Sequence, residues 1–187
     1  LLHVRSLVHL GRGTEALAIL DVTRVLPSEH ARESHQMYVH AHTLAALAAI
    51  DAARLDDAYS HLTAALDWPE RLGQGRPYDP EERQIHFLMG RIDQRRGRAA
   101  DAARHFEAVV VATSPGRAGL TRLDLLAIAA LRALGRAQDI DRLVLTAAVR
   151  SATDAGLRQV AEALARDEAI ATLTAAQPRL FGDLDGT

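Results

Sequence analysis

The chain has 187 residues, 48% of them hydrophobic and 25% charged, and carries a formal net charge of -2 at pH 7. All 22 basic residues are Arg, and Lys, Asn and Cys do not occur. These absences exclude a Walker-type phosphate loop, a Schiff-base lysine, a thiol nucleophile, a disulfide and a thiolate metal site. The near-neutral charge and the lack of an apolar run of roughly 20 residues favour a cytoplasmic protein without a membrane span or direct contact to nucleic acid.

Apolar periodicity and turn signals predict a chain made almost entirely of helices. In chain order, the predicted helices cover residues 1–10, 14–25, about 29–53, 56–66, 80–96, 99–112, 120–134, 139–152 and about 157–176. Gly11 and Gly13 supply the first turn. The clearest helix start is Asp79-Pro80-Glu81-Glu82, where Asp79 can cap the helix, Pro80 suits its first position and Glu82 can close a capping box.

A short unit recurs along the chain: a small residue at a turn, then Ala, then a large apolar residue. The copies are Gly11…Ala16…Leu20, Ala53…Ala58…Leu62, Gly97…Ala102…Phe106 and a degraded Gly135…Ile140…Val144, with spacings of 42, 44 and 38 residues. In stacked helical hairpins the Ala lets two backbones approach closely, and the larger residue fills the gap to the next hairpin. We therefore expect Ala58, Ala102 and Phe106 to be buried.

The segment 79–115 resembles a tetratricopeptide repeat. Met89-Gly90 stands for the motif's Leu-Gly-like pair, and the motif's Ala, aromatic residue and Pro are matched by Ala102, Phe106 and Pro115. His86 replaces the motif's Trp and Asp93 replaces its Tyr. The repeats are longer than the roughly 34 residues of the family, and such stretched repeats are similar to the sensor regions of bacterial transcriptional regulators that carry a LuxR-type DNA-binding domain.

The resemblance implies an all-α fold, a right-handed α-solenoid of three to four antiparallel helical hairpins with a C-terminal capping helix. It implies one domain over residues 1–178, with repeats at about 1–27, 28–69, 79–115 and 116–153, a capping helix at 157–176 and a flexible tail at 179–187. Proteins of this kind bind a protein or peptide in a concave groove. The chain is accordingly expected to be a binding module of a regulator, without cofactor or catalytic residues.

In the resembled family the first helix of each hairpin lines the groove. Transferring that phase to this chain gives Arg5, His40, Thr43, Gln84, Phe87, Arg91, Arg95, Arg122, Leu125 and Arg132. Arg pairs bidentately with carboxylates, so the resemblance points to an acidic peptide as the ligand. The alternative, that these Arg side chains are solvated or pair with acidic residues of neighbouring helices, stays open.

Two patterns that suggest catalysis or metal binding have simpler explanations. On a helix His35 and His42 share a face while His40 points elsewhere, so the three do not form a three-ligand metal site. Gly11-Arg12-Gly13-Thr14 lacks the Lys of a phosphate loop and reads as a hairpin turn. No catalytic, cofactor-binding or metal-binding residue is predicted.

Other functions are compatible with the same pattern. The first alternative is a stand-alone adaptor or oligomerisation scaffold, and homo-oligomer formation is compatible with either reading. The second alternative is an enzyme that uses a pocket of His and carboxylate residues. The helix that precedes Gly11 starts at Leu1, which leads us to expect that the chain is the C-terminal part of a longer polypeptide with an effector domain upstream.

Overall fold

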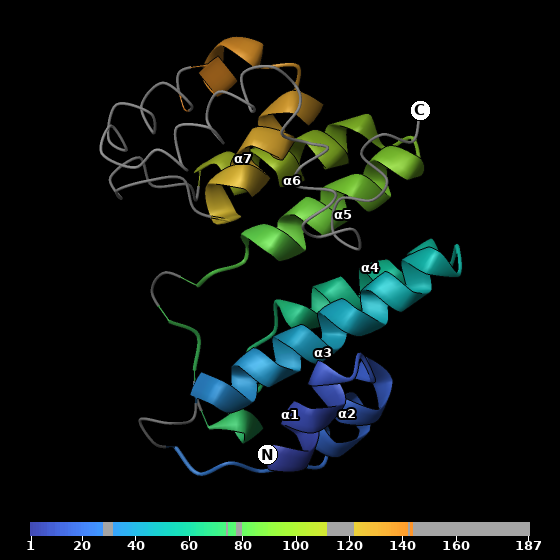
Figure 1. Ribbon diagram of the computed structural model, residues 1–187, viewed down its shortest axis with the longest axis vertical. Helices are drawn as coiled ribbons and strands as arrows, with labels where there is room; N and C mark the ends of the chain where they lie inside the picture. The colour runs from blue at the N-terminus through green and yellow to red at the C-terminus, as the bar shows by residue number, and fades with distance from the viewer. Residues whose placement is uncertain (28–31, 74, 78–79, 112–121, 142, 144–187) are drawn as a thin grey trace. The chain divides into compact units, whose positions relative to one another are not determined.

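The computed structural model describes residues 1–27, 32–73, 75–77, 80–111, 122–141 and 143 (Figure 1). The described elements are α1 (Leu2–His9), α2 (Gly13–Leu20), α3 (Arg32–Asp51), α4 (Leu55–Ala65), the short 3-10 helix η1 (Glu70–Leu72), α5 (Arg83–Arg95), α6 (Ala99–Val111) and α7 (Arg122–Ala133). No strand occurs in this part of the chain, which confirms the all-α prediction there. The predicted capping helix and tail, and most of the predicted helix 139–152, lie outside the described residues.

The chain forms two compact units, Leu1–Ile92 and Asp93–Thr187, with the boundary inside α5. In the first unit α1 packs on α2 and α3, α2 packs on α3, and α3 packs along α4, as Figure 1 shows. In the second unit α6 packs on α7. The order of neighbours within each unit follows the order of the chain, and the single domain expected over residues 1–178 stays a prediction.

Four turns share one backbone conformation. Their central residues have left-handed φ angles: 74° at Gly11, 56° at Ala53, 71° at Gly97 and 71° at Gly135. An Arg follows each of them, and its N–H bonds the carbonyl five residues back: Arg12 to Leu7 (2.9 Å), Arg54 to Ala49 (2.8 Å), Arg98 to Asp93 (2.8 Å) and Arg136 to Leu131 (2.9 Å). This is the Schellman pattern, in which a left-handed residue ends a helix and its last carbonyls are satisfied. The unit found in the sequence is thus a recurring local structure.

The predicted close-packing positions are buried. Ala58 and Leu62 of α4 are 0% exposed, and Ala102 and Phe106 of α6 are 2% and 1% exposed. The equivalent residue of the degraded fourth copy, Ile140, is only half-buried. Ala16 and Leu20 of the first copy are also 0% exposed, so burial in the first three copies confirms the expectation from the repeated unit.

Gly13 belongs to a helix contact and not to the turn. It is the first residue of α2, and it is buried against α3. A Cβ at this position would lie 2.6 Å from the carbonyl oxygen of Ala41 and 2.8 Å from the Cβ of Leu44. Only Gly permits the backbones of α2 and α3 to approach so closely, because any side chain would collide with the backbone of α3.

The helix α2 ends at Leu20 and not at Val25 as predicted. The chain after α2 runs alongside η1, where the N–H of Val25 donates to the carbonyl of Arg71 (2.8 Å). Because that hydrogen bond joins segments far apart in the sequence, helical periodicity alone could not reveal it.

The helix α5 begins at Arg83 and not at Pro80. The carboxylate of Glu81 accepts the backbone N–H of Arg83 at 3.2 Å, so Glu81 satisfies a donor of the first turn. The Oε2 atom of Glu82 accepts a hydrogen bond from Arg76 (2.8 Å), and the capping box predicted for Glu82 and Asp79 stays a prediction. The residue predicted as the cap, Asp79, lies outside the described residues.

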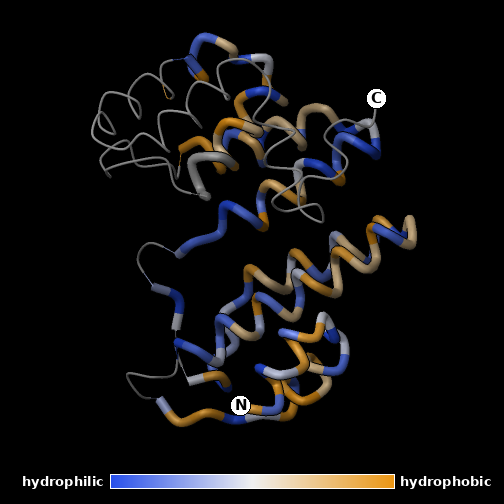
Figure 2. Tube along the Cα trace, viewed as in Figure 1, coloured by the Kyte–Doolittle hydropathy of each residue, from blue (hydrophilic) through white to orange (hydrophobic). Residues whose placement is uncertain are grey.

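Each helix is amphipathic, with hydrophobic and hydrophilic residues interleaved along its length (Figure 2). One hydrophobic cluster in the core of the first unit comprises Val4, Leu7, Ala16, Leu17, Leu20, Met37, Tyr38, Ala41, Ala45 and Leu72. Within the described ranges, none of the helices combines the length and apolarity that a membrane crossing requires.

Candidate functional site

The predicted groove residues have different surroundings. Arg5, His40, Arg95 and Arg132 are exposed, Gln84 and Arg91 are half-buried, Thr43 and Phe87 are buried, and the side chains of Arg122 and Leu125 lie outside the described residues. Arg5 of α1 forms an ion pair with Glu33 of α3. This pair matches the alternative in which an arginine is neutralised by a neighbouring helix.

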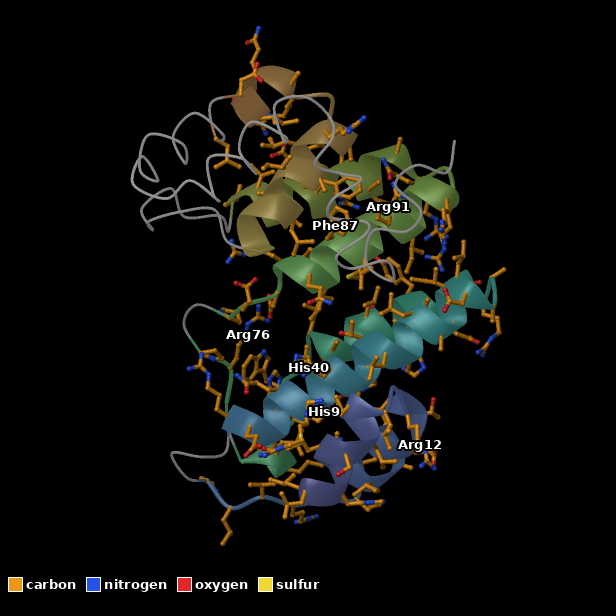
Figure 3. The ribbon with its side chains drawn as sticks, viewed as in Figure 1. His9, Arg12, His40, Arg76, Phe87 and Arg91 are labelled. Carbon is orange, nitrogen blue, oxygen red and sulfur yellow. The ribbon has the colours of Figure 1, made fainter. Side chains whose placement is uncertain are left out.

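Two of the predicted groove residues serve the interior. Phe87 is 0% exposed, and Figure 3 shows it one helical turn before Arg91 on α5. Thr43 is 7% exposed, and its hydroxyl donates to the carbonyl of Val39 (2.8 Å). A ligand could touch neither side chain without displacing its neighbours. The remaining residues are divided between the two units, and their gathering on one surface stays a prediction.

A cluster of rings lies between α3, α4 and the segment after α4. This histidine–aromatic cluster consists of His35, Tyr38, His42, His61 and Trp68. The ring of His35 stacks on Trp68 with centroids 3.4 Å apart, and the rings of Tyr38 and His42 form a T-shaped pair with centroids 4.5 Å apart. His42 Nδ1 and His61 Nδ1 are 3.1 Å apart. The helical register that puts His35 and His42 on one face of α3 brings both into this cluster, and His40 is exposed, as the sequence predicted.

Burial favours the neutral form of two histidines in this cluster, His35 and His42. It lowers the pKa of His42 to about 4, with the nearby His61 as the second cause. Burial also lowers the pKa of His35, opposed by the hydrogen bond that its Nε2–H donates to the carbonyl of Asp67 (3.1 Å). At neutral pH both rings therefore act as hydrogen-bonding and packing groups without charge.

The segment after α4 is held to the first two helical hairpins by Arg71 and Leu72. The guanidinium of Arg71 lies 5.7 Å from the ring centre of Tyr38 and donates to the carboxylate of Asp21 (3.1 Å). Leu72 is completely buried, and its carbonyl accepts a hydrogen bond from the buried hydroxyl of Ser34 (2.7 Å). These contacts fix the position of Trp68 against α3.

A second polar cluster surrounds Asp93, whose side chain is 1% exposed. Three cationic or titratable groups approach its oxygens: Arg96 at 3.7 Å, His105 at 3.8 Å and Arg98 at 4.0 Å. Neither carboxylate oxygen accepts a hydrogen bond. Burial lowers the pKa of His105, and the charge of Asp93 opposes that effect. The Asp93 cluster thus holds its buried carboxylate by charge at distances beyond hydrogen bonding.

Asp93 is the exception at its position in the repeat. The residues four before the four turn residues are Leu7, Ala49, Asp93 and Leu131, and all four are buried. The first, second and fourth copies bury an apolar side chain there, and the third copy buries the carboxylate of Asp93. Aligning the four turns in the sequence reveals an acidic residue at an otherwise apolar position. The alignment does not reveal that Arg96 and His105 surround the carboxylate.

Among the described residues, no group of three or more His, Asp or Glu is arranged to hold a metal ion. The histidine–aromatic cluster contains imidazole groups, which can exchange protons. The Asp93 cluster contains an imidazole, a carboxylate and guanidinium groups, which can pair with opposite charges. Comparison of the chain with models of protein families, with curated proteins and with solved structures finds no match.

Proposed function

We propose that this chain is a protein- or peptide-binding module of tandem helical hairpins, arranged as a tetratricopeptide-like right-handed solenoid, and that it is the sensing region of a bacterial transcriptional regulator. The observation that carries the proposal is the recurrence of one Schellman turn at four sites, each followed by Arg. A helical pair cannot bury its apolar face alone, so recurrence of the pair along a chain is typical of stacked repeats.

Packing in the first unit supports this arrangement. Each helix from α1 to α4 packs on the next, and α1 also packs on α3. Stacked hairpins show this order of neighbours, because the first helix of one hairpin lies against both helices of the preceding one. Solenoids of this kind present extended surfaces that bind other proteins.

The proposed ligand is an acidic peptide or protein segment. Arg91 and Arg95 lie one turn apart on α5, and Arg132 is exposed on α7. Arginine pairs with carboxylates through two parallel hydrogen bonds, and three arginines on the first helices of their hairpins suit a ligand with several carboxylates.

The test is binding of labelled acidic, basic and apolar peptides, measured by fluorescence anisotropy. We expect acidic peptides to bind and their affinity to fall as salt rises, because ion pairs are screened over about 8–10 Å. Arg91→Ala and Arg95→Ala should each weaken binding several-fold. The control is Arg12→Ala, because Arg12 lies at the α1–α2 turn and pairs with Glu15 at 2.6 Å (Figure 3). Preference for apolar or basic peptides, unaffected by Arg91→Ala, would contradict the proposed ligand.

A further inference from the structure

His42 and His61 connect α3 to α4 through a contact that depends on their protonation. Their Nδ1 atoms are 3.1 Å apart and their ring centres 5.3 Å apart. A hydrogen bond between them needs one Nδ1–H and one Nδ1 lone pair, which two neutral rings supply. If both rings are protonated, two N–H groups and two positive charges face each other, and the hydrogen bond is lost.

The ring of His42 has little contact with solvent. His42 is 9% exposed, and the ring of Tyr38 packs against it in a T-shaped arrangement. His61 is half-buried and can turn toward water. Burial is the larger cause of the lowered pKa of His42, and the charge of His61 is the smaller one. Turning His61 away therefore removes only the smaller penalty, and a protonated His42 is hydrated only when α3 and α4 move apart.

Charged groups on the neighbouring elements also affect the pKa of His42, but they do not restore its ordinary value. Asp21, after α2, and Asp67, after α4, favour the protonated form of His42, and Arg71 of η1 opposes it. Asp21 already accepts a hydrogen bond from Arg71 (3.1 Å). Burial and His61 outweigh both carboxylates, so the pKa of His42 stays well below its ordinary value.

Histidine recurs at the same two positions relative to the next turn. His42 stands 11 residues before Ala53 and His61 stands 8 after it, and His86 and His105 have the same offsets from Gly97. Four of the nine histidines thus occupy two repeat positions. The second and third copies thus share the two histidines, whereas the fourth copy has Asp124 and Leu143 at these offsets and the first copy has Ile19 at the second offset.

We propose that the His42–His61 contact is an acid-sensitive link between α3 and α4, which holds the helices together when it is neutral and lets them separate when both rings are protonated. Separation exposes the face of α4 that carries the buried Ala58 and Leu62. The link regulates the integrity of the second hairpin, and it does not depend on which ligand the proposed binding module takes.

The experiment is hydrogen exchange of the slowest α4 amides between pH 7 and pH 4.5, corrected for the intrinsic pH dependence of exchange. Uptake of one proton on opening makes the opening equilibrium rise up to tenfold for each unit of pH decrease. We expect that slope in the wild-type protein, and we expect His42→Gln to reduce it by up to one decade for each pH unit. The slope is the measured quantity, so a general loss of stability in His42→Gln does not obscure the result.

Two further variants complete the test. His61→Gln removes the charge that faces His42, so the pKa of His42 in the folded protein should rise toward its ordinary value. The opening equilibrium should therefore depend on pH over a narrower range. His9→Gln removes an exposed imidazole at the end of α1, and its slope should equal that of the wild type. Equal slopes in the wild type and His42→Gln, or no slope in the wild type, would overturn the proposal.

Discussion

The second and third turns of this chain have the same backbone and different polar interiors. Ala53 and Gly97 both adopt left-handed φ angles, and the next Arg bonds the carbonyl five residues back in both. Four residues before the turn, however, the second turn buries Ala49 and the third buries Asp93. The backbone hydrogen bonds do not depend on that side chain, so the same turn accommodates an apolar or an acidic residue.

The histidines near the two turns have different partners. His61 faces the imidazole of His42, whereas His105 lies 3.8 Å from the carboxylate of Asp93. The first arrangement contains the buried imidazole of His42, whose lowered pKa makes it sensitive to acid. In the second arrangement the carboxylate of Asp93 depends on the cations around it, because a buried carboxylate without hydrogen bonds is stabilised by charge alone. The comparison shows that the repeat specifies the backbone, while its side chains set how each copy responds to charge.

Moving the carboxylate of the third turn into the second should have the largest effect. Ala49→Asp buries a carboxyl group where the counterpart of Arg96 is Ala52. Arg54 and His61 stand at the positions of Arg98 and His105, so the closest of the three groups that approach Asp93 is missing. We expect a loss of about 4–5 kcal/mol in the free energy of unfolding, measured by urea denaturation. The control, Ala48→Asp at the neighbouring exposed position, should cost less than about 1 kcal/mol. Similar losses in both variants would refute the comparison.

Removing the charge of the third turn should have the next largest effect. Asp93→Asn removes the buried negative charge that Arg96, Arg98 and His105 approach, and we expect a loss of about 3 kcal/mol. Asp101→Asn breaks a substantially exposed pair with Arg104 and should cost less than about 1 kcal/mol. Because Asp93 raises the pKa of His105, that pKa should be lower in Asp93→Asn by NMR titration. An unchanged titration would show that the two groups do not interact.

The pH dependence of stability should reflect the neutral histidines. The pKa of His42 is about 4 in the folded protein, below the roughly 6.5 of an unfolded chain. The unfolded state therefore binds the proton first, and the stabilisation is complete above about pH 6.5 and lost as pH falls toward 4. Discounted for partial solvation, we expect His42 to contribute about 2 kcal/mol of this loss in urea unfolding at pH 7.5 and 4.5. Glu82, whose pKa burial raises, acts in the opposite direction. Stability that rises on acidification would contradict this prediction.

Exchanging the turn residues should have the smallest effect and should test whether the turns are equivalent. A Cβ at Gly97 meets no atom within 4 Å, so the cost of Gly97→Ala comes from the left-handed backbone alone. We expect a loss of about 1 kcal/mol, and a gain of up to about 1 kcal/mol for Ala53→Gly. Thermal unfolding of both variants provides the measurement. A loss in Ala53→Gly would mean that Ala53 is not strained.

Several predictions made from the sequence hold because they depend on neighbours along the chain. A Gly or small residue at the left-handed position ends a helix locally, and a helical period places Ala58 and Leu62 on one buried face of α4. The face shared by His35 and His42 follows from the same period. The resemblance to tetratricopeptide repeats placed Phe87 on an exposed groove, because the helical face of the family's groove residues was transferred to this chain. Phe87 is completely buried in the structure, and that burial depends on surrounding residues that helical periodicity does not specify.

The sequence by itself determined the helical character of the described residues, the four turns and the small and large residues packed beside them. Tertiary structure alone decided that α2 ends at Leu20, where the following chain bonds Arg71, and that His42 meets His61 across two helices. It also decided that a carboxylate four residues before a turn is surrounded by Arg96 and His105. Backbone conformation and periodicity are local properties that the residue types encode, whereas desolvation and charge pairing depend on which side chains the packed helices bring within a few ångströms of one another.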